Sequence, residues 1–211
     1  MDERTRAFYA DYAIHGVAAE SPHSAMLPHL LRWLPPGRTV LDVGAGAGRD
    51  VAALIEAGRP AWGLEPHDGM RERAATLFPV TRGRLRSAQL PDLGRPWVDE
   101  RPQGFDAVVC SAVLMHIAPA DLAATLMALV SQLDPAAEPQ AARLFLAVPE
   151  MAPDRLVAAR DPDGRQFHNH DPAALQALLA ERGLRAVDTA VNDAVLASTA
   201  TRWHTLVLAQ A

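Results

Sequence analysis

The feature that most constrains this chain is a short glycine-rich segment, residues 40–50, which reads VLDVGAGAGRD. An apolar run of strand length is followed by Gly44, Gly46 and Gly48, and a helical pattern begins near Arg49. Glycine adopts positive φ without strain, and its missing Cβ lets backbone N–H groups approach a ligand. The segment therefore predicts a buried strand, a tight turn and a helix, with a nucleotide-like cofactor at the turn.

Strand and helix patterns alternate along the rest of the chain. Apolar runs of strand length lie at 38–44, 60–66, 105–111, 142–149, 184–191 and 204–210, with a weaker one at 79–85. Helical patterns lie at 21–34, 49–58, 68–78, 118–133 and 171–184. The first four of the stronger runs lack polar alternation, which is typical of strands buried on both faces of a parallel sheet. The order predicts a doubly wound α/β sheet.

The ends of several elements carry recognisable signals. Ser21 followed by Pro22 predicts the start of the first of these helices, and Asp171 followed by Pro172 predicts the start of the last. Between the last two strands there is no helical pattern, only the segment NDAVLASTATRW. We therefore expect those two strands to form an antiparallel hairpin at the end of a parallel sheet.

The spacing of the glycines separates two classes of cofactor. The dinucleotide fingerprint is G-x-G-x-x-G, whereas here the third glycine, Gly48, comes one residue too early and Arg49 follows it. Asp42, two residues before the first glycine, would repel a pyrophosphate but could accept from a cationic ligand. A nicotinamide-dependent reductase is therefore disfavoured.

The pattern acid-x-G-x-G-x-G on a first strand resembles the class I S-adenosylmethionine-dependent methyltransferases. The likeness continues in order through residues 30–211, in segments that resemble the later strands and turns of that family. These segments are GLEP (63–66), EPHDGMRERA (65–74), FDAVVCSAVLMHI (105–117), RLFLAVPE (143–150), RQFHNHDPAALQALLAERGLRAV (165–187) and WHTLVLA (203–209).

The resemblance implies a fold and a division of the chain. The fold is α/β, with a Rossmann-like doubly wound seven-stranded sheet that is mostly parallel, an antiparallel C-terminal strand, and helices on both faces. Residues 1–211 would form one methyltransferase domain. Its parts would be N-terminal helices or a lid at 1–36, a cofactor-binding half at 37–150, and a substrate lid with the C-terminal strands at 151–211.

The resemblance also implies a set of residues that bind S-adenosylmethionine and its product S-adenosylhomocysteine. Glu65, about 20 residues after the glycines, is expected to accept the ribose hydroxyls. Pro66 and Met70 could line the adenine or simply begin a helix. Ser87 stands where the family often has an acid for the adenine amino group, so backbone contacts are the alternative there. The full set is Asp42, Gly44, Ala45, Gly46, Gly48, Arg49, Glu65, Pro66, Met70, Ser87, Ser111 and Met115.

Two histidines are the candidate general bases, and we expect no metal. His168 lies in the long loop after the fifth strand, where the family builds its substrate lid, and His116 follows the fourth strand. A histidine with an ordinary pKa near 6.5 suits a base at neutral pH. The competing interpretation is that the enzyme only positions the acceptor and the methyl group, and that these histidines only shape the pocket. Tyr9 and Tyr12, which lie on one helical face, are further candidates for the base.

The composition of the chain indicates which classes of partner are disfavoured. The net charge is −5, the pI is about 5.9 and every strong base is arginine, so an extended phosphate-binding face is disfavoured. No apolar run reaches the roughly 18 residues of a membrane span, and Cys110 sits in an apolar run as a small buried residue. The residues SAVL follow the fourth strand, where methyltransferases that act on nucleic-acid bases often carry an NPPY-like motif. A nucleic-acid acceptor is therefore disfavoured.

Together with the resemblance to class I methyltransferases, these observations predict a cytoplasmic enzyme, monomer or homodimer, that methylates an O or N atom of a small-molecule acceptor and binds neither nucleic acid nor membrane. The alternative is a non-catalytic protein that binds S-adenosylmethionine or S-adenosylhomocysteine.

Overall fold

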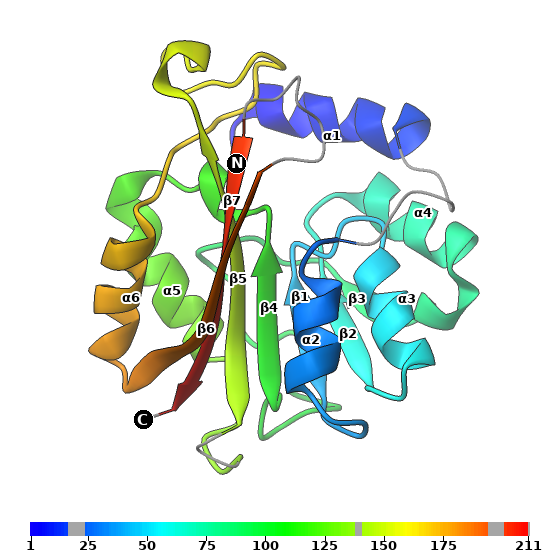
Figure 1. Cartoon of the computed structure of the whole chain (residues 1–211). Coiled ribbons are helices and arrows are strands. Elements are labelled where there is room, and N and C mark those ends of the chain that lie inside the picture. The colour runs from blue at the N-terminus through cyan, green and yellow to red at the C-terminus, as the bar shows by residue number, and fades with distance from the viewer. Residues whose placement is uncertain (17–23, 138–140, 194–200, 211) are drawn as a thin grey trace.

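Figure 1 shows the computed structural model of the chain, which describes residues 1–16, 24–137, 141–193 and 201–210. Its strands form one seven-stranded sheet in the order β3-β2-β1-β4-β5-β7-β6. The strands are β1 (Val40–Val43), β2 (Ala61–Leu64), β3 (Leu85–Arg86), β4 (Ala107–Ser111), β5 (Ala142–Met151), β6 (Leu184–Asp193) and β7 (Thr201–Gln210). β1 to β5 pair in parallel, and β7 runs antiparallel to β5 and β6. The Rossmann-like α/β sheet with an antiparallel C-terminal strand is confirmed.

Helices cover both faces of the sheet. They are α1 (Glu3–His15), α2 (Leu27–Trp33), α3 (Arg49–Glu56), α4 (Asp68–Leu77), α5 (Leu122–Val130) and α6 (Pro172–Ala180). Leucines of α2 and α3 pack on one face, in a cluster that includes Leu30 and Leu54. Leucines of α5 and α6 pack on the other face, in a cluster that includes Leu129 and Leu175. All residues of β1 and β2 are buried, as expected for strands covered on both sides.

Some boundaries differ from the sequence expectation. α2 begins at Leu27 rather than near residue 21, and the expected cap at Ser21 and Pro22 lies outside the described residues. The weak strand expected at 79–85 is a short 3₁₀ helix, Pro79–Thr81, followed by the two-residue strand β3. Here the proline begins a tight turn of helix, which leaves little chain for pairing.

The N-terminal helix lies across the carboxyl ends of the strands (Figure 1). Its cap is Asp2, whose side chain accepts hydrogen bonds from the backbone N–H groups of Arg4 and Thr5. β1 and β4 are neighbours in the sheet although β2 and β3 lie between them in the sequence. The strand order reverses between β1 and β4, and in open α/β sheets a ligand site forms at this position. α1 therefore lies above the place where the fold favours a site.

Among the helices of the described residues, none combines the length and apolar character that a membrane crossing requires.

The start of β4 depends on a glycine that no other residue could replace without strain. Gly104 has φ +103°, and a Cβ built on it would lie 2.6 Å from the carbonyl oxygen of Gln132. The next residue, Phe105, donates its N–H to that carbonyl at 2.9 Å, and its own carbonyl accepts from Asp134 at 2.8 Å. This close backbone approach joins the strand to the segment after α5.

We predict that Gly104→Ala destabilises the protein by several kcal/mol, because left-handed strain of about 1–3 kcal/mol adds to a backbone clash. Gly94→Ala is the matched control, since Gly94 has φ +56° and open space around it. We expect the control to lose only about 1–2 kcal/mol from the backbone conformation. Urea unfolding of both variants measures the difference, and equal losses would contradict the close approach at Gly104.

Candidate active site

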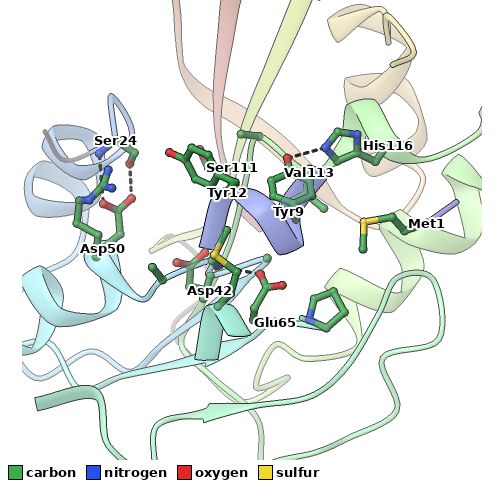
Figure 2. A pocket seen from close by; sticks show the side chains of 18 residues that line it. Met1, Tyr9, Tyr12, Ser24, Asp42, Asp50, Glu65, Ser111, Val113 and His116 are labelled. Carbon is green, nitrogen blue, oxygen red and sulfur yellow. Dashed lines mark hydrogen bonds between the residues drawn. The ribbon is translucent and has the colours of Figure 1, made fainter. Parts of the chain in front are cut away.

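A cavity of about 310 Å³ lies at the carboxyl ends of β1, β2 and β4 (Figure 2). Tyr9 and Tyr12 of α1 are among its lining residues. This volume is at the lower end of the roughly 300–1,000 Å³ usual for small-molecule sites. The residues that line it are Met1, Tyr9, Tyr12, Ser24, Asp42, Gly44, Ala45, Gly46, Ala47, Arg49, Asp50, Glu65, Pro66, Met70, Ser111, Ala112, Val113 and His116. Most of the predicted cofactor residues therefore converge on one cavity.

The three glycines of the loop after β1 all have positive φ, but they have different structural roles. A Cβ on Gly44 would lie 2.2 Å from Val113 Cγ2, so this glycine lets the loop pack against the turn after β4. A Cβ on Gly48 would lie 3.0 Å from the Cβ of Ala74, so this glycine brings α3 close to α4. Gly46 has no atom within 4 Å of its Cβ position and lines the cavity. Of the three, Gly46 is the one that leaves space for a ligand.

Glu65, which follows β2, ties two loops together. One carboxylate oxygen accepts the N–H of Gly46 and the other accepts the N–H of His67, both at 2.9 Å. Burial raises the pKa of Glu65, while these two backbone hydrogen bonds oppose the rise. The carboxylate is thus held at the cavity wall with lone pairs left for hydroxyl donors.

Asp42, on β1, places a second acid under the cavity. Its side chain is buried, and this burial is the main reason that its pKa lies well above the usual value for aspartate. The negative charges of Asp50 and Glu65 raise the pKa further. Three carboxyl groups around one cavity favour a ligand with positive charge, because a cation would offset their mutual repulsion.

Ser24 and Asp50 form a part of the wall that the sequence analysis missed. The backbone N–H of Ser24 donates to Asp50 Oδ1 at 3.3 Å, and its hydroxyl donates to Oδ2 (Figure 2). Asp50 lies two residues after the last glycine of the motif and so had a local signal in the sequence. Ser24 had none, because it reaches the cavity only through the fold.

Tyr9 and His116 meet at the opposite side of the cavity (Figure 2). The Tyr9 hydroxyl lies 2.9 Å from His116 Nε2, and His116 Nδ1 lies 2.6 Å from the carbonyl oxygen of Gln166. Burial lowers the pKa of His116 and raises the pKa of Tyr9, so both groups favour their neutral forms. Both residues are candidates from the sequence, but their contact could not be predicted from it.

Four predicted site residues do not line the cavity. Gly48 serves helix packing, as described above, and Ser87 is exposed after β3. Met115 is buried in a cluster with Met151 and Phe167. His168 donates its backbone N–H to the carbonyl of Met115 at 2.8 Å, and its Nε2 lies 3.0 Å from Nε2 of Gln166.

Two other potentially reactive side chains, His170 and Cys110, have structural roles. His170 Nε2 hydrogen-bonds the carbonyls of Leu114 and Ile117, which ties the loop before α6 to the turn after β4. Cys110 is fully buried on β4, and burial raises the pKa of its thiol far above the usual range. Within the described parts of the chain, no group of three or more His, Cys, Asp or Glu residues is placed to hold a metal ion.

Part of the chain matches a family model, and half of it matches a distant relative. Residues 40–136 match a family model described as a methyltransferase domain. A 105-residue stretch, half of the chain, is 27% identical to protein-L-isoaspartate O-methyltransferase 1 of Cupriavidus necator. The chain spans 40% of the length of that relative.

Solved structures share the fold over the full chain. A magnesium protoporphyrin IX methyltransferase from Synechocystis, with bound S-adenosylmethionine, aligns over 100% of this chain and 99% of its own, with a TM-score of 0.69 and 17% identity. The 1,6-didemethyltoxoflavin-N1-methyltransferase of Burkholderia thailandensis, with that compound and S-adenosylhomocysteine bound, aligns over 98% and 87%, with a TM-score of 0.68 and 19% identity. The methyltransferase-domain match, the shared fold and the glycine–acid cavity together support a class I S-adenosylmethionine-dependent methyltransferase.

Proposed function

We propose that this chain transfers a methyl group from S-adenosylmethionine to an oxygen or nitrogen atom of a small-molecule acceptor. The observation that carries the proposal is the cavity in which Asp42, Gly46 and Glu65 converge at the carboxyl ends of the strands. The same cavity supports S-adenosylmethionine as the cofactor. One structural neighbour was crystallised with S-adenosylmethionine and another with its product S-adenosylhomocysteine.

Each part of the cavity has a role in this proposal. The Glu65 carboxylate would accept the ribose hydroxyls with the lone pairs that its two backbone hydrogen bonds leave free. The open space at Gly46 would admit the ligand against the backbone. Asp42 and Asp50 would face its positively charged part, and Pro66 and Met70 would provide an apolar wall for the adenine.

When bound, S-adenosylmethionine supplies an electrophilic methyl group on a positively charged sulfur. The contribution of the chain is to hold the acceptor in line with that methyl group and to exclude water. α1 supports both tasks, because Tyr9 and Tyr12 extend from it over the cavity (Figure 2).

The small-molecule acceptor is inferred from charge and size. The net charge of −5 and the absence of lysine speak against a nucleic acid acceptor. The cavity is small, and two of the structural neighbours are named for small-molecule substrates. We further propose that the protein works in the cytoplasm, away from membranes, as a monomer or homodimer. The alternative remains a non-catalytic protein that binds the same cofactor.

We predict that S-adenosylmethionine and S-adenosylhomocysteine each raise the melting temperature, and that NAD does not. A ligand that binds only the native state stabilises it by about 2.7 kcal/mol at a hundredfold excess over its dissociation constant. Differential scanning fluorimetry with each compound measures the shift. No shift at millimolar S-adenosylmethionine would contradict the proposed cofactor, and release of S-adenosylhomocysteine with a member of an acceptor library would distinguish the enzyme from the non-catalytic alternative.

We predict that Gly46→Val abolishes binding of S-adenosylhomocysteine while the protein stays folded. The new side chain would occupy the space that the ligand needs at the cavity wall. Gly94→Val is the matched control, because Gly94 has nearly the same φ, +56° against +53°, and equally open surroundings, but lies outside the cavity lining. Calorimetric titration should therefore show lost binding in the first variant only; equal affinities would mean that Gly46 does not contact the ligand.

We predict opposite effects of Asp42→Asn on stability and on binding. A carboxyl group whose folded-state pKa is raised makes the protein less stable as pH rises above the unfolded-state value of about 3.9. Removing this group should therefore increase the free energy of unfolding, by an amount that is larger at pH 8 than at pH 5. The same change should weaken the binding of S-adenosylmethionine, because it removes a negative charge that faces a cation.

Urea unfolding at the two pH values, together with titration of S-adenosylmethionine, tests this pair of effects. A loss of stability in Asp42→Asn at pH 8 would show that the buried carboxylate is stabilised by groups that we have not identified.

A further inference from the structure

A continuous chain of hydrogen bonds leads from the cavity into the loop after β5. The Tyr9 hydroxyl is 2.9 Å from His116 Nε2, and His116 Nδ1 is 2.6 Å from the carbonyl oxygen of Gln166. The Tyr9 and His116 rings meet edge to face, with centroids 5.6 Å apart and an interplanar angle of 79°. Three segments remote in the sequence therefore build one polar path at the cavity wall.

The chemistry of the groups fixes the direction of these hydrogen bonds. A carbonyl oxygen only accepts, so Nδ1 of His116 carries the proton that it shares with Gln166. In the neutral ring Nε2 is then an acceptor, and the Tyr9 hydroxyl must be its donor. Arg165 donates a hydrogen bond to the Tyr9 oxygen. A second lone pair of that oxygen, on a side chain that lines the cavity, remains available to accept a proton from a bound molecule.

Charged groups around this path assist a proton in transit. Arg165 opposes the burial-driven rise in the pKa of Tyr9, and it also lowers the pKa of His116. Its Nε donates to Asp161 Oδ2 at 2.7 Å, which fixes it in place. Asp161 and Asp2 act on His116 in the opposite sense and favour its charged form. Positive and negative charges thus flank the pair, so that a phenolate and an imidazolium both have a compensating charge nearby.

We propose that Tyr9 is the catalytic base of the proposed methyl transfer, and that His116 is the positioning residue that receives the proton through it. The acceptor X–H bond breaks as its proton passes to the Tyr9 oxygen, while the Tyr9 O–H proton passes to His116 Nε2. The acceptor atom uses the freed electron pair to bond the methyl carbon, and the electrons of the carbon–sulfur bond return to sulfur. His116 is left as an imidazolium, hydrogen-bonded to Gln166 through Nδ1, and later loses its proton to water.

The path exists only while α1 is docked on the loop after β5. Asp2 accepts from Arg160 at 3.3 Å, and the Thr5 hydroxyl oxygen accepts the backbone N–H of Gln166 at 2.8 Å. These two contacts hold the start of α1 against the loop that also supplies the carbonyl partner of His116. Closing the helix over the cavity and assembling the base are therefore one event.

This proposal replaces His168 as the first candidate for the base. The His168 side chain does not line the cavity, and its Nε2 faces the Gln166 amide. His116 lines the cavity but has both ring nitrogens occupied, one by Tyr9 and one by Gln166. The Tyr9 oxygen donates to His116 and accepts from Arg165, and it is the group of this path that keeps a further acceptor position.

The test compares Tyr9→Phe, His116→Asn and the control His15→Asn, which replaces an exposed histidine on the same helix. Tyr9→Phe keeps the ring contact and removes only the hydroxyl. General base catalysis contributes about 10²–10⁴-fold, so both site variants should lose at least about 10²-fold in kcat with affinity for S-adenosylmethionine within a few-fold. The control should retain full turnover. His116→Asn should also flatten the acidic limb of the pH profile, where protonation of His116 stops the wild-type enzyme.

A second measurement needs neither cofactor nor acceptor. In the ligand-free protein, NMR titration should show a higher pKa for His116 in Tyr9→Phe than in the wild type, because the variant lacks the hydroxyl that stabilises the neutral ring. The proposal is overturned if this pKa is unchanged, if Tyr9→Phe keeps turnover within a few-fold, or if both site variants lose cofactor affinity as strongly as turnover. A wild-type protein that does not bind S-adenosylmethionine would instead overturn the proposed function.

Discussion

The arrangement of the site depends on one carboxylate, that of Glu65, which accepts backbone N–H groups from two different loops. Its hydrogen bonds to Gly46 and His67 hold the glycine loop after β1 against the segment that begins α4. The sheet brings the two loops together as far as Leu64, whose carbonyl accepts the N–H groups of Gly44 and Ala45, and the Glu65 carboxylate extends this link to Gly46 and His67. The acid is thus a structural tie of the protein before any ligand is considered. Since each carboxylate oxygen has more than one lone pair, the same group remains able to accept hydroxyl donors from the cavity.

Acids at this site lower stability in order to favour a cationic ligand. Asp42 is buried beneath the cavity, and Asp50 and Glu65 add negative charge close to it. Burial of a carboxylate is unfavourable unless an opposite charge or hydrogen bonds compensate it. A positively charged ligand would supply that compensation, so part of its binding energy would come from relief of a strained electrostatic arrangement. The placement is understandable only if the ligand is part of the functional state, because an apolar residue on β1 would pack as well and would not repel its neighbours.

The parts of the fold and site that could be predicted are those encoded over short distances in the sequence. The glycines, Asp42 and Glu65 belong to two strand–turn–helix units, and buried apolar runs indicated the strands that carry them. The contact between Tyr9 and His116 joins residues 107 positions apart and depends on how α1 settles on the sheet, so no local pattern encodes it. His168 was a reasonable candidate from the length of its loop. Its backbone hydrogen bond instead ties that part of the loop to Met115 in the turn after β4, and its side chain does not line the cavity.

The N-terminal helix connects these features, because it is the element that covers the cavity and also completes its polar side. It carries Tyr9 and Tyr12 on the face toward the cavity, and its first turn is fastened to the loop after β5 through Asp2 and Thr5. The sheet and the glycine loop alone provide a place for a cofactor but leave the opposite wall open. Chemistry on an acceptor additionally requires exclusion of water and a group that takes a proton, and in our proposal both come from the helix. The contacts that dock α1 through Asp2 and Thr5 lie outside the glycine motif, and in our proposal they serve binding and catalysis together.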